Sequence, residues 1–241
     1  MFENEFLFRK NDFEVYQNTL VIVSSLNEEK GIVPTLMELD HFLVGCKLLV
    51  VDGNSTDRTV ENASVLGASV IFQKGKGKGD AIRYALKYVE NIFDYVVLID
   101  ADHTYPAKFL PAMIHILEKN PEIGMVCGNR FCSNLELGPM HNLLYFGNKL
   151  ICFTHTVFNG VTLQDPLTGL RVIRGSILRG WQPKSAGFDI EVELNCHVQR
   201  YGYKTAEIDI SYRERIGKKK LKIRDGLTIF KRIICETIFA G

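Results

Sequence analysis

The chain reads YVVLIDADHTYP at residues 95–106, and this stretch decides how the rest of the sequence is interpreted. Five consecutive apolar residues, three of them β-branched, predict a strand that is buried on both faces of a sheet. The strand runs directly into Asp100 and Asp102, whose side chains fall on the same side of an extended chain. Two carboxylates at this spacing suit Mg²⁺ or Mn²⁺, completed by a substrate phosphate. A solvated turn at the strand end is the alternative interpretation.

Earlier segments of the chain repeat the pattern of a short apolar run followed by polar residues. We expect strands at residues 20–23, 46–51 and 68–72, with helices between them. Strands that alternate with helices predict an α/β fold, with a mostly parallel central sheet flanked by helices on both faces. Ligands of such sheets bind outside the carboxyl ends of the strands. The polar clusters at residues 27–28 and 52–57 lie at the carboxyl ends of their strands, as do Asp100 and Asp102. Together they predict a common site.

A glycine-lysine run, KGKGKGD, occupies residues 74–80. It is not a phosphate-binding GxxxxGK[ST] loop, because Gly79 is followed by Asp80, and no GxGxxG motif follows the first strand. The glycines permit close approach of a ligand to the backbone, and Lys76 and Lys78 are candidates to meet phosphate. The alternative is a flexible basic turn that caps the next helix.

Composition excludes several classes of function. The chain has 241 residues, of which 46% are apolar, and a net charge of +1, so we expect no nucleic-acid partner. Its six cysteines form no CxxC pair, which favours reduced thiols in the cytoplasm over disulfides or a zinc site. Residues 1–18 lack the core of a signal peptide, and no run approaches the length of a membrane span. We therefore expect a cytoplasmic protein with no spanning segment.

Several motifs, taken in order, resemble those of family 2 glycosyltransferases of the GT-A fold. They are NEE at residues 27–29, DGNSTD at 52–57, GKGDA at 77–81, DAD at 100–102, GNRF at 128–131, DPLTGLR at 165–171, FDIEVE at 188–193 and RIGKKKL at 215–221. The pattern is most similar to that of the dolichyl- and polyprenyl-phosphate sugar synthases, and it covers residues 20–215. The chain departs from that pattern at Ser24 (usually Pro), Thr104 (Gln in the mannosyl enzymes) and Lys219 (Ser).

The resemblance implies a role for each matching residue. Glu28 and Asp52 would bind the ribose and base of a nucleoside diphosphate sugar, and Asp100 and Asp102 would hold Mg²⁺ or Mn²⁺ against its diphosphate. The implied donor- and cofactor-binding residues are Glu28, Asp52, Lys78, Asp80, Asp100 and Lys220, and the implied catalytic residues are Asp102, Asp165, Arg130 and Arg215.

The cationic residues of this set would bind phosphate groups. Arg130, Arg215 and Lys220 would supply positive charge to the acceptor phosphate and the diphosphate, and we expect the two arginines to meet phosphate rather than carboxylates of the fold. Asp165 would act as a base or orient Arg171, or it would only cap a turn as a buried carboxylate. A phosphate acceptor is already anionic near neutral pH, so it needs no strong base.

The predicted function is transfer of a hexose or N-acetylhexosamine from a nucleoside diphosphate sugar to a polyprenyl (dolichyl) phosphate, with inversion at the anomeric carbon. One alternative is a family 2 enzyme that glycosylates a sugar hydroxyl, for which Asp165 would be an essential base. Another is a non-catalytic nucleotide-sugar-binding subunit. We expect an N-terminal arm at residues 1–19, the GT-A domain at 20–215 and a basic amphipathic appendage at 216–241.

The appendage is a candidate for contact with a membrane, where a polyprenyl phosphate resides. Its basic residues are Lys218, Lys219, Lys220, Lys222 and Arg224. Residues 227, 230, 234 and 238 then follow helical spacing and are apolar, while Lys231, Arg232 and Glu236 fall mostly on other faces. A basic helix with an apolar face is typical of peripheral binding to the cytoplasmic face of a membrane. The same helix could instead pack on the body of the protein or on a second copy in a homo-oligomer.

Residues 138–160 form a second amphipathic segment, which mixes leucines and phenylalanines with polar residues. The spacing predicts a helix, and we expect it to lie near the acceptor side of the site. Packing into the core is the alternative for its apolar face.

Overall fold

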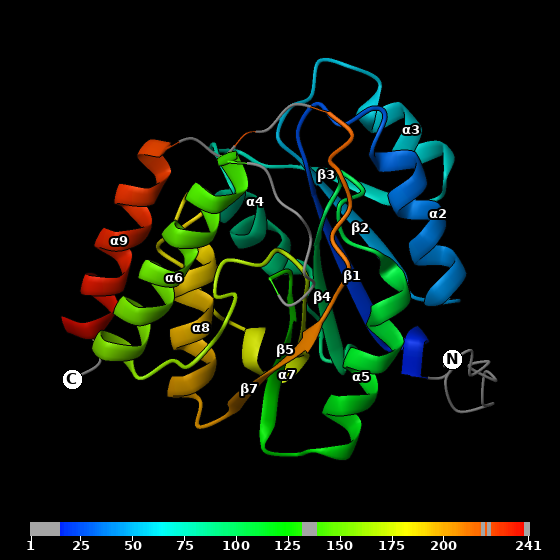
Figure 1. Ribbon diagram of the computed structural model, residues 1–241. Coiled ribbons are helices and arrows are strands. Elements are labelled where there is room, and N and C mark those ends of the chain that lie inside the picture. The colour runs from blue at the N-terminus through cyan, green and yellow to red at the C-terminus, as the bar shows by residue number, and fades with distance from the viewer. Residues whose placement is uncertain (1–14, 132–138, 218–219, 221–222, 239–241) are drawn as a thin grey trace, which may run out of the picture.

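The computed structural model describes residues 15–131, 139–217, 220 and 223–238. Its centre is a seven-stranded sheet in the order β3-β2-β1-β4-β6-β5-β7, in which only β6 runs against its neighbours. The strands are β1 (Thr19–Ser25), β2 (Lys47–Asp52), β3 (Ser69–Phe72), β4 (Tyr95–Asp100), β5 (Ile123–Asn129), β6 (Arg171–Arg174) and β7 (Lys204–Asp209). The predicted α/β class with a mostly parallel sheet is confirmed (Figure 1).

Two hydrophobic cores form because successive side chains of each strand point to opposite faces. In β1, Val21 and Val23 belong to one core, while Leu20 and Ile22 belong to the other. The first core receives helices α2 (Ile32–Phe42), α3 (Thr59–Val65) and α5 (Leu110–Lys119), and the second receives α4 (Lys78–Ala85), α7 (Gly175–Leu178) and α8 (Ile190–Arg200). Short 3₁₀ turns, η1 (Leu86–Tyr88) and η2 (Ala107–Phe109), complete these connections.

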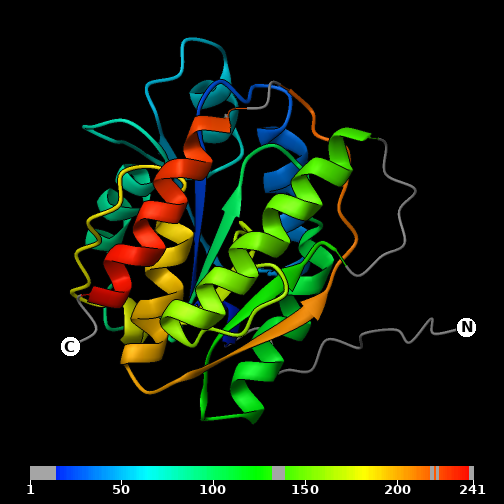
Figure 2. The ribbon, with the colours of Figure 1, turned by 60° about the vertical axis from the view of Figure 1, so that its left-hand side comes forward.

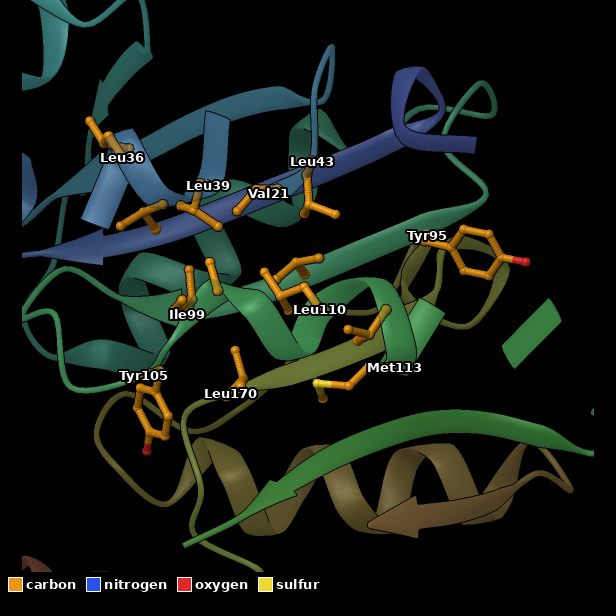
Figure 3. Close-up of a cluster of buried hydrophobic side chains, with 14 of the residues drawn as sticks. Val21, Leu36, Leu39, Leu43, Tyr95, Ile99, Tyr105, Leu110, Met113 and Leu170 are labelled. Atoms are coloured by element: carbon orange, nitrogen blue, oxygen red, sulfur yellow. The ribbon is translucent and has the colours of Figure 1, made fainter. Parts of the chain in front are cut away.

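The first core brings α2 and α5 against the central strands (Figure 3). Leu39 of α2 and Leu110 of α5 are completely buried, and their side chains lie close to Val21 of β1 and Ile99 of β4. Because β4 has buried side chains on both faces, its position in the sheet is fixed from both sides. The carboxyl end of β4 is thereby fixed as well.

A further layer of two long helices, α6 (Pro139–Asn159) and α9 (Ile223–Ile238), covers α8 on the side away from the sheet (Figures 1 and 2). Ile229 and Ile233 of α9 are buried against Val192 of α8, and the amide of Asn159 donates a hydrogen bond of 3.1 Å to the carbonyl of Ile233. The C-terminal helix therefore packs on the body of the protein through this side.

Two charged residues of α9 lie on the side that packs on the body. Arg232 and Glu236 face the body: Arg232 pairs with Asp189 at 3.2 Å, and the buried carboxylate of Glu236 accepts a hydrogen bond of 2.7 Å from Arg200. The opposite side of α9 exposes large apolar residues. The prediction that Arg232 and Glu236 fall on other faces of the helix than residues 227, 230 and 238 is confirmed, and the side that carries these two charges is the one that packs on the body. Of the predicted N-terminal arm, the first fourteen residues lie outside the described residues, as do Lys218, Lys219 and Lys222 of the basic run.

The register of the central strands gathers polar side chains at one edge of the sheet. Ser24 of β1 lies opposite Asp100 of β4, and Ser25 lies opposite Asp52 of β2. Both serines donate to these neighbours, at 3.1 Å to Asp100 and 2.9 Å to Asp52. Asn129 ends β5 at the same edge, because β5 runs parallel to β4. The predicted gathering of polar residues at the carboxyl ends of the strands thus follows from the order of the strands in the sheet.

The glycine-lysine run approaches another part of the backbone. The amides of Gly79 and Asp80 donate to the carbonyls of Gly187 and Ala186, both at 3.1 Å. A Cβ atom at Gly79 would lie 2.4 Å from the carbonyl oxygen of Ser185, which leaves no room for any side chain. The close approach that the glycines permit is therefore to the loop that precedes α8.

We predict that Gly79→Ala destabilises the fold, because the added methyl group forces apart two segments that are joined by backbone hydrogen bonds. The free energy of unfolding should fall by about 1–3 kcal/mol, as for overpacking of a tight interior. Chemical denaturation measures the change. The control is Gly226→Ala in α9, where a Cβ meets no atom within 4 Å, and this change should stabilise the helix slightly. Equal stability of the two variants would contradict the packing role of Gly79.

Candidate active site

Asp100 and Asp102 leave β4 together but bind different partners. The Oδ1 atom of Asp100 accepts from Ser24 at 3.1 Å and from the Lys78 ammonium at 2.7 Å. The Oδ1 atom of Asp102 accepts from the hydroxyl and amide of Thr104, at 2.6 and 3.1 Å, and its Oδ2 atom lies 3.1 Å from Arg215. Thr104 therefore orients Asp102 and leaves Oδ2 as the atom that faces the cationic side of the site.

Lys78 lies beneath Asp100, where it bridges two carboxylates. Its ammonium is 2.7 Å from Asp100 and 3.0 Å from Glu191 of α8, and all three side chains are largely buried. Burial by itself would raise the pKa of Asp100, but the Lys78 ammonium and the hydrogen bonds from Lys78 and Ser24 hold this pKa below its ordinary value. Burial raises the pKa of Glu191 despite the attraction of Lys78. Lys78 thus binds Asp100, which the sequence pattern did not reveal.

Glu28 pairs with two cationic side chains from the segment that follows β7. Its Oε1 atom accepts a hydrogen bond of 2.6 Å from Arg215 and a second bond from Lys220. The amide of Glu28 is held at 2.8 Å by the hydroxyl of Thr59, so the side chain projects from a fixed backbone. Glu28, Asp102, Arg215 and Lys220 therefore form one connected cluster, and all four had been expected in the site.

Asp52 and Asp80 accept hydrogen bonds from neighbouring segments of the chain. Asp52 is completely buried, and it accepts hydrogen bonds from Ser25 at 2.9 Å and from the amide and hydroxyl of Ser55, both at 2.6 Å. Asp80 accepts from the amide of Gly75 at 2.7 Å, which closes the glycine-rich turn. The expected contacts of both aspartates with the donor stay predictions.

Arg130 and Asp165 form a buried pair on the far side of the site. The Nε and Nη2 atoms of Arg130 donate to the two oxygens of Asp165 at 2.6 and 2.7 Å, and the Arg130 amide adds a third bond of 3.1 Å. Burial alone would lower the pKa of Arg130, but nearby Tyr105 and Asp165 raise it. The expectation that Arg130 and Arg215 meet phosphate rather than carboxylates of the fold is wrong as regards the carboxylates, because Arg130 pairs with Asp165 and Arg215 with Glu28 and Asp102; that they also bind phosphate stays a prediction.

Arg171, which had been considered a partner of Asp165, binds elsewhere. It is completely buried, and it donates to the carbonyls of Pro166 and Thr168 at 2.7 and 3.0 Å and to Asn195 at 2.5 Å. These bonds fix the loop between Asp165 and β6 from within. Asp165 is oriented by Arg130 instead.

Other residues hold the site in place and gave no signal in the sequence. Glu207 of β7 accepts from the amides of Gln164 and Asp165, at 2.7 and 2.8 Å. The Tyr105 hydroxyl accepts from the amide of Gly169 at 2.7 Å. The Nη2 and Nη1 atoms of Arg213 donate to the two carboxylate oxygens of Glu38 in α2, at 2.5 and 2.9 Å. These partners are 42 to 175 positions apart in the chain, so no local spacing relates them.

The acidic residues fit a divalent metal that is shared with a phosphate ligand. Among the described residues, no group of three or more His, Cys, Asp or Glu side chains is placed to hold a metal by itself. Mg²⁺ commonly binds through one or two carboxylates and takes its other ligands from phosphates and water. Asp102 through Oδ2, with Asp100 beside it, supplies such a partial set.

Comparison with known proteins agrees with this geometry. The profile described as "Glycosyl transferase family 2" matches residues 20–181. The dolichyl-phosphate hexose transferase of Haloferax volcanii is 32% identical over 223 residues, which cover 91% of this chain and 93% of that protein. The dolichol-phosphate mannosyltransferase of Pyrococcus furiosus is 26% identical over 219 residues, or 88% of this chain, and the chain spans 60% of that enzyme's length.

Solved structures share the whole fold. Glucosyl-3-phosphoglycerate synthase from Mycobacterium tuberculosis in complex with UDP superposes with a TM-score of 0.73 at 20% identity, covering 97% of this chain and 86% of that one. The same enzyme with Mn²⁺, UDP and glucosyl-3-phosphoglycerate gives a TM-score of 0.72 at 21% identity, covering 98% and 85%. The fold and the acidic sheet edge define a glycosyltransferase of the GT-A class. Within that class, the chain belongs to glycosyl transferase family 2.

We predict that Lys78→Met destabilises the protein strongly, because it leaves Asp100 and Glu191 buried without their cation. Removing one partner of a buried ion pair costs about 3–5 kcal/mol, so the melting temperature should fall by roughly 10 °C. Differential scanning calorimetry measures the shift.

The matched control is Lys76→Met, which changes an exposed lysine of the same run and should leave stability within about 0.5 kcal/mol. If Lys78→Met melts like the wild type and only weakens nucleotide binding, Lys78 is a phosphate ligand rather than the counter-ion of Asp100.

Proposed function

We propose that this glycosyltransferase moves a hexose from a nucleoside diphosphate sugar to a polyprenyl phosphate. The observation that carries the proposal is the pairing of Asp165 with Arg130. Both oxygens of Asp165 are bound by the guanidinium, and the carboxylate is completely buried. A general base must reach the proton that it removes. A carboxylate held in this way favours an acceptor that is already ionised, and a phosphate monoester carries −1.5 to −2 charges at neutral pH.

Similarity to the Haloferax volcanii dolichyl-phosphate hexose transferase along nearly the full length of both chains supports the same acceptor class. Glu28 and Asp52 are our candidates for the nucleoside, and Arg130, Arg215 and Lys220 for the two phosphate groups. A bound Mg²⁺ or Mn²⁺ would act as a Lewis acid that offsets charge on the departing diphosphate. The chain's own part is to hold Asp102 oriented through Thr104 and to keep Asp100 ionised through Lys78.

A transfer assay tests this proposal. The purified chain is incubated with radiolabelled nucleoside diphosphate hexoses, polyprenyl phosphate and Mn²⁺, and label is measured in the organic phase. We expect transfer that EDTA abolishes, and Asp102→Ala should reduce it by about 100-fold or more, as for loss of one charge-stabilising group. The control, Asp94→Ala, removes an exposed carboxylate at the opposite end of β4 and should transfer normally.

Two other outcomes would contradict the proposal. Label that passes only to a sugar hydroxyl would identify a glycan-assembling transferase, in which Asp165 must be released to act as a base. Binding of the nucleotide sugar without any turnover would identify a non-catalytic subunit.

We further propose that the protein works at the cytoplasmic face of a membrane, which it meets through α6 and α9. None of the helices in the described part of the chain has the length and apolar character needed to cross a bilayer. Instead, α6 exposes Leu150, Phe153 and Val157 along one stripe, and α9 exposes Leu227, Phe230 and Ile238. These side chains are 42–70% exposed. Large apolar side chains that stay exposed along one side of a helix point to an interaction site.

A lipid surface fits these stripes better than a protein partner for two reasons. Both helices begin at the end of the molecule where the parallel strands end, as Figure 2 shows, and the α9 stripe starts at Leu227, in the first turns of its helix. The chain segment that leads into α9 is also rich in lysine, which attracts anionic headgroups.

Free thiols at all five described cysteines support a reducing compartment. The domain limits at residues 19 and 215 stay predictions.

Vesicle flotation tests the membrane face. Phe153→Asp and Phe230→Asp should each weaken binding to anionic vesicles about tenfold or more, because burying one phenylalanine contributes roughly 1.5–3 kcal/mol. The control is Val65→Asp, which alters a still more exposed apolar residue, in α3, and should bind like the wild type.

Gel filtration of the same variants decides whether a second copy of the chain covers the stripes instead. A wild-type dimer that both substitutions convert to a monomer, with no vesicle binding in any form, would contradict the membrane assignment.

A further inference from the structure

Arg215 occupies the position from which a metal ion would approach Asp102. Its Nη2 atom lies 2.6 Å from Glu28 Oε1 and 3.1 Å from Asp102 Oδ2. The other oxygen of Asp102 is already taken by the hydroxyl and amide of Thr104. A divalent cation at Asp102 Oδ2 would therefore meet a guanidinium on the same atom. Two like charges this close repel strongly in a partly buried site, so the metal and this position of Arg215 are mutually exclusive.

Glu28 does not depend on Arg215 alone. Lys220 binds the same oxygen, Oε1, so departure of the arginine leaves this buried carboxylate neutralised. Glu28 thus has two cationic partners, Arg215 and Lys220, and Arg215 can leave while Lys220 stays. This removes the main cost of moving Arg215, which would otherwise be an unpaired buried charge.

The backbone around Arg215 is fixed, so only its side chain has to move. The amide of Arg213 donates to the carbonyl of Thr104 at 3.0 Å, and the amide of Ile216 donates to that of Asp102 at 3.4 Å. The Arg213 side chain is clamped on Glu38. Within the described residues, the Nε atom of Arg215 has no hydrogen-bond partner although it is buried. The Nε atom of Arg215 can therefore donate a hydrogen bond to a further acceptor, such as a ligand.

We propose that Arg215 couples metal binding to donor binding: it neutralises Asp102 in the free protein and transfers to the donor diphosphate when metal and donor enter together. The inference rests on the proposed nucleoside diphosphate donor. Without nucleotide, the guanidinium competes with the metal for Asp102. With nucleotide, the diphosphate offers Arg215 a new anionic partner and leaves Asp102 to the metal. Because coupling between two ligands is reciprocal, each should raise the affinity of the protein for the other by the same factor.

Binding measurements on the full chain test the coupling without reference to turnover. Mn²⁺ binding is followed by electron paramagnetic resonance, and binding of UDP and GDP by calorimetry, each alone and in the presence of the other ligand. For the wild type we expect Mn²⁺ to bind weakly alone, and nucleotide to strengthen its binding by about 5- to 100-fold.

Arg215→Met should change the two affinities in opposite directions. Mn²⁺ alone should bind several-fold more tightly than to the wild type, because Asp102 is no longer paired, whereas nucleotide should bind more weakly. Purely structural damage would weaken both. Arg215→Lys retains a charge near Asp102 and should restore weak binding of Mn²⁺ alone. The control Arg200→Met removes the same charge at the carboxyl end of α8, where its partner is Glu236 of α9, so the affinity for Mn²⁺ alone should stay unchanged.

Two results would overturn the coupling while leaving the donor assignment intact. One is tight binding of Mn²⁺ to the free wild-type protein that nucleotide does not improve. The other is an unchanged affinity for Mn²⁺ alone in Arg215→Met. A wild-type protein that binds neither UDP nor GDP in the presence of Mn²⁺ would overturn the donor assignment, and the coupling with it.

Discussion

Compensation of buried negative charge is the constraint on which this structure depends. Glu28, Asp102 and Asp165 are each less than 5% exposed at one edge of the sheet. An ionised carboxylate is stable in such a place only if a cation and hydrogen bonds accompany it. Lys78 compensates Asp100, Arg130 compensates Asp165, and Arg215 compensates both Glu28 and Asp102. The active site is therefore assembled from ion pairs before any ligand is bound.

These ion pairs also connect segments that are distant in the chain. Arg215 and Lys220 bring the stretch after β7 across the ends of β1 and β4. Lys78 and Glu191 join the amino ends of α4 and α8, and the tight contact at Gly79 seals the same junction. The residues that hold the site together are thus largely those that are expected to bind its ligands. Binding of an anionic donor must then redistribute existing contacts, which is why coupling between ligands is expected here.

Two properties of the molecule point to the same acceptor. The fully bonded Asp165 suits an acceptor that is already ionised and needs no base to become a nucleophile, and a phosphate monoester is one. The apolar stripes on α6 and α9 suit an acceptor whose hydrocarbon chain lies in a membrane. The side of α9 that packs on the protein carries both apolar and charged residues, whereas the side that faces solvent is apolar. A helix that only covers a core has the opposite arrangement, with its apolar side inward and its charged side in solvent. The charged side of α9 is compensated by α8, so its outer side is free for another role.

The sequence by itself determined the α/β class, the strands from β1 to β4, the convergence of polar residues at their carboxyl ends and the family, because hydrophobic periodicity and short motifs are local properties. It did not determine the reversed strand β6 or its place between β4 and β5, because pairing over such separations leaves no periodic signal. Nor did it assign Lys78 to Asp100, Arg130 to Asp165 or Arg232 to Asp189. A lysine or arginine in a motif looks the same whether it binds phosphate or a buried carboxylate. Only the tertiary structure decides, because it sets which charges lose their water and must find one another.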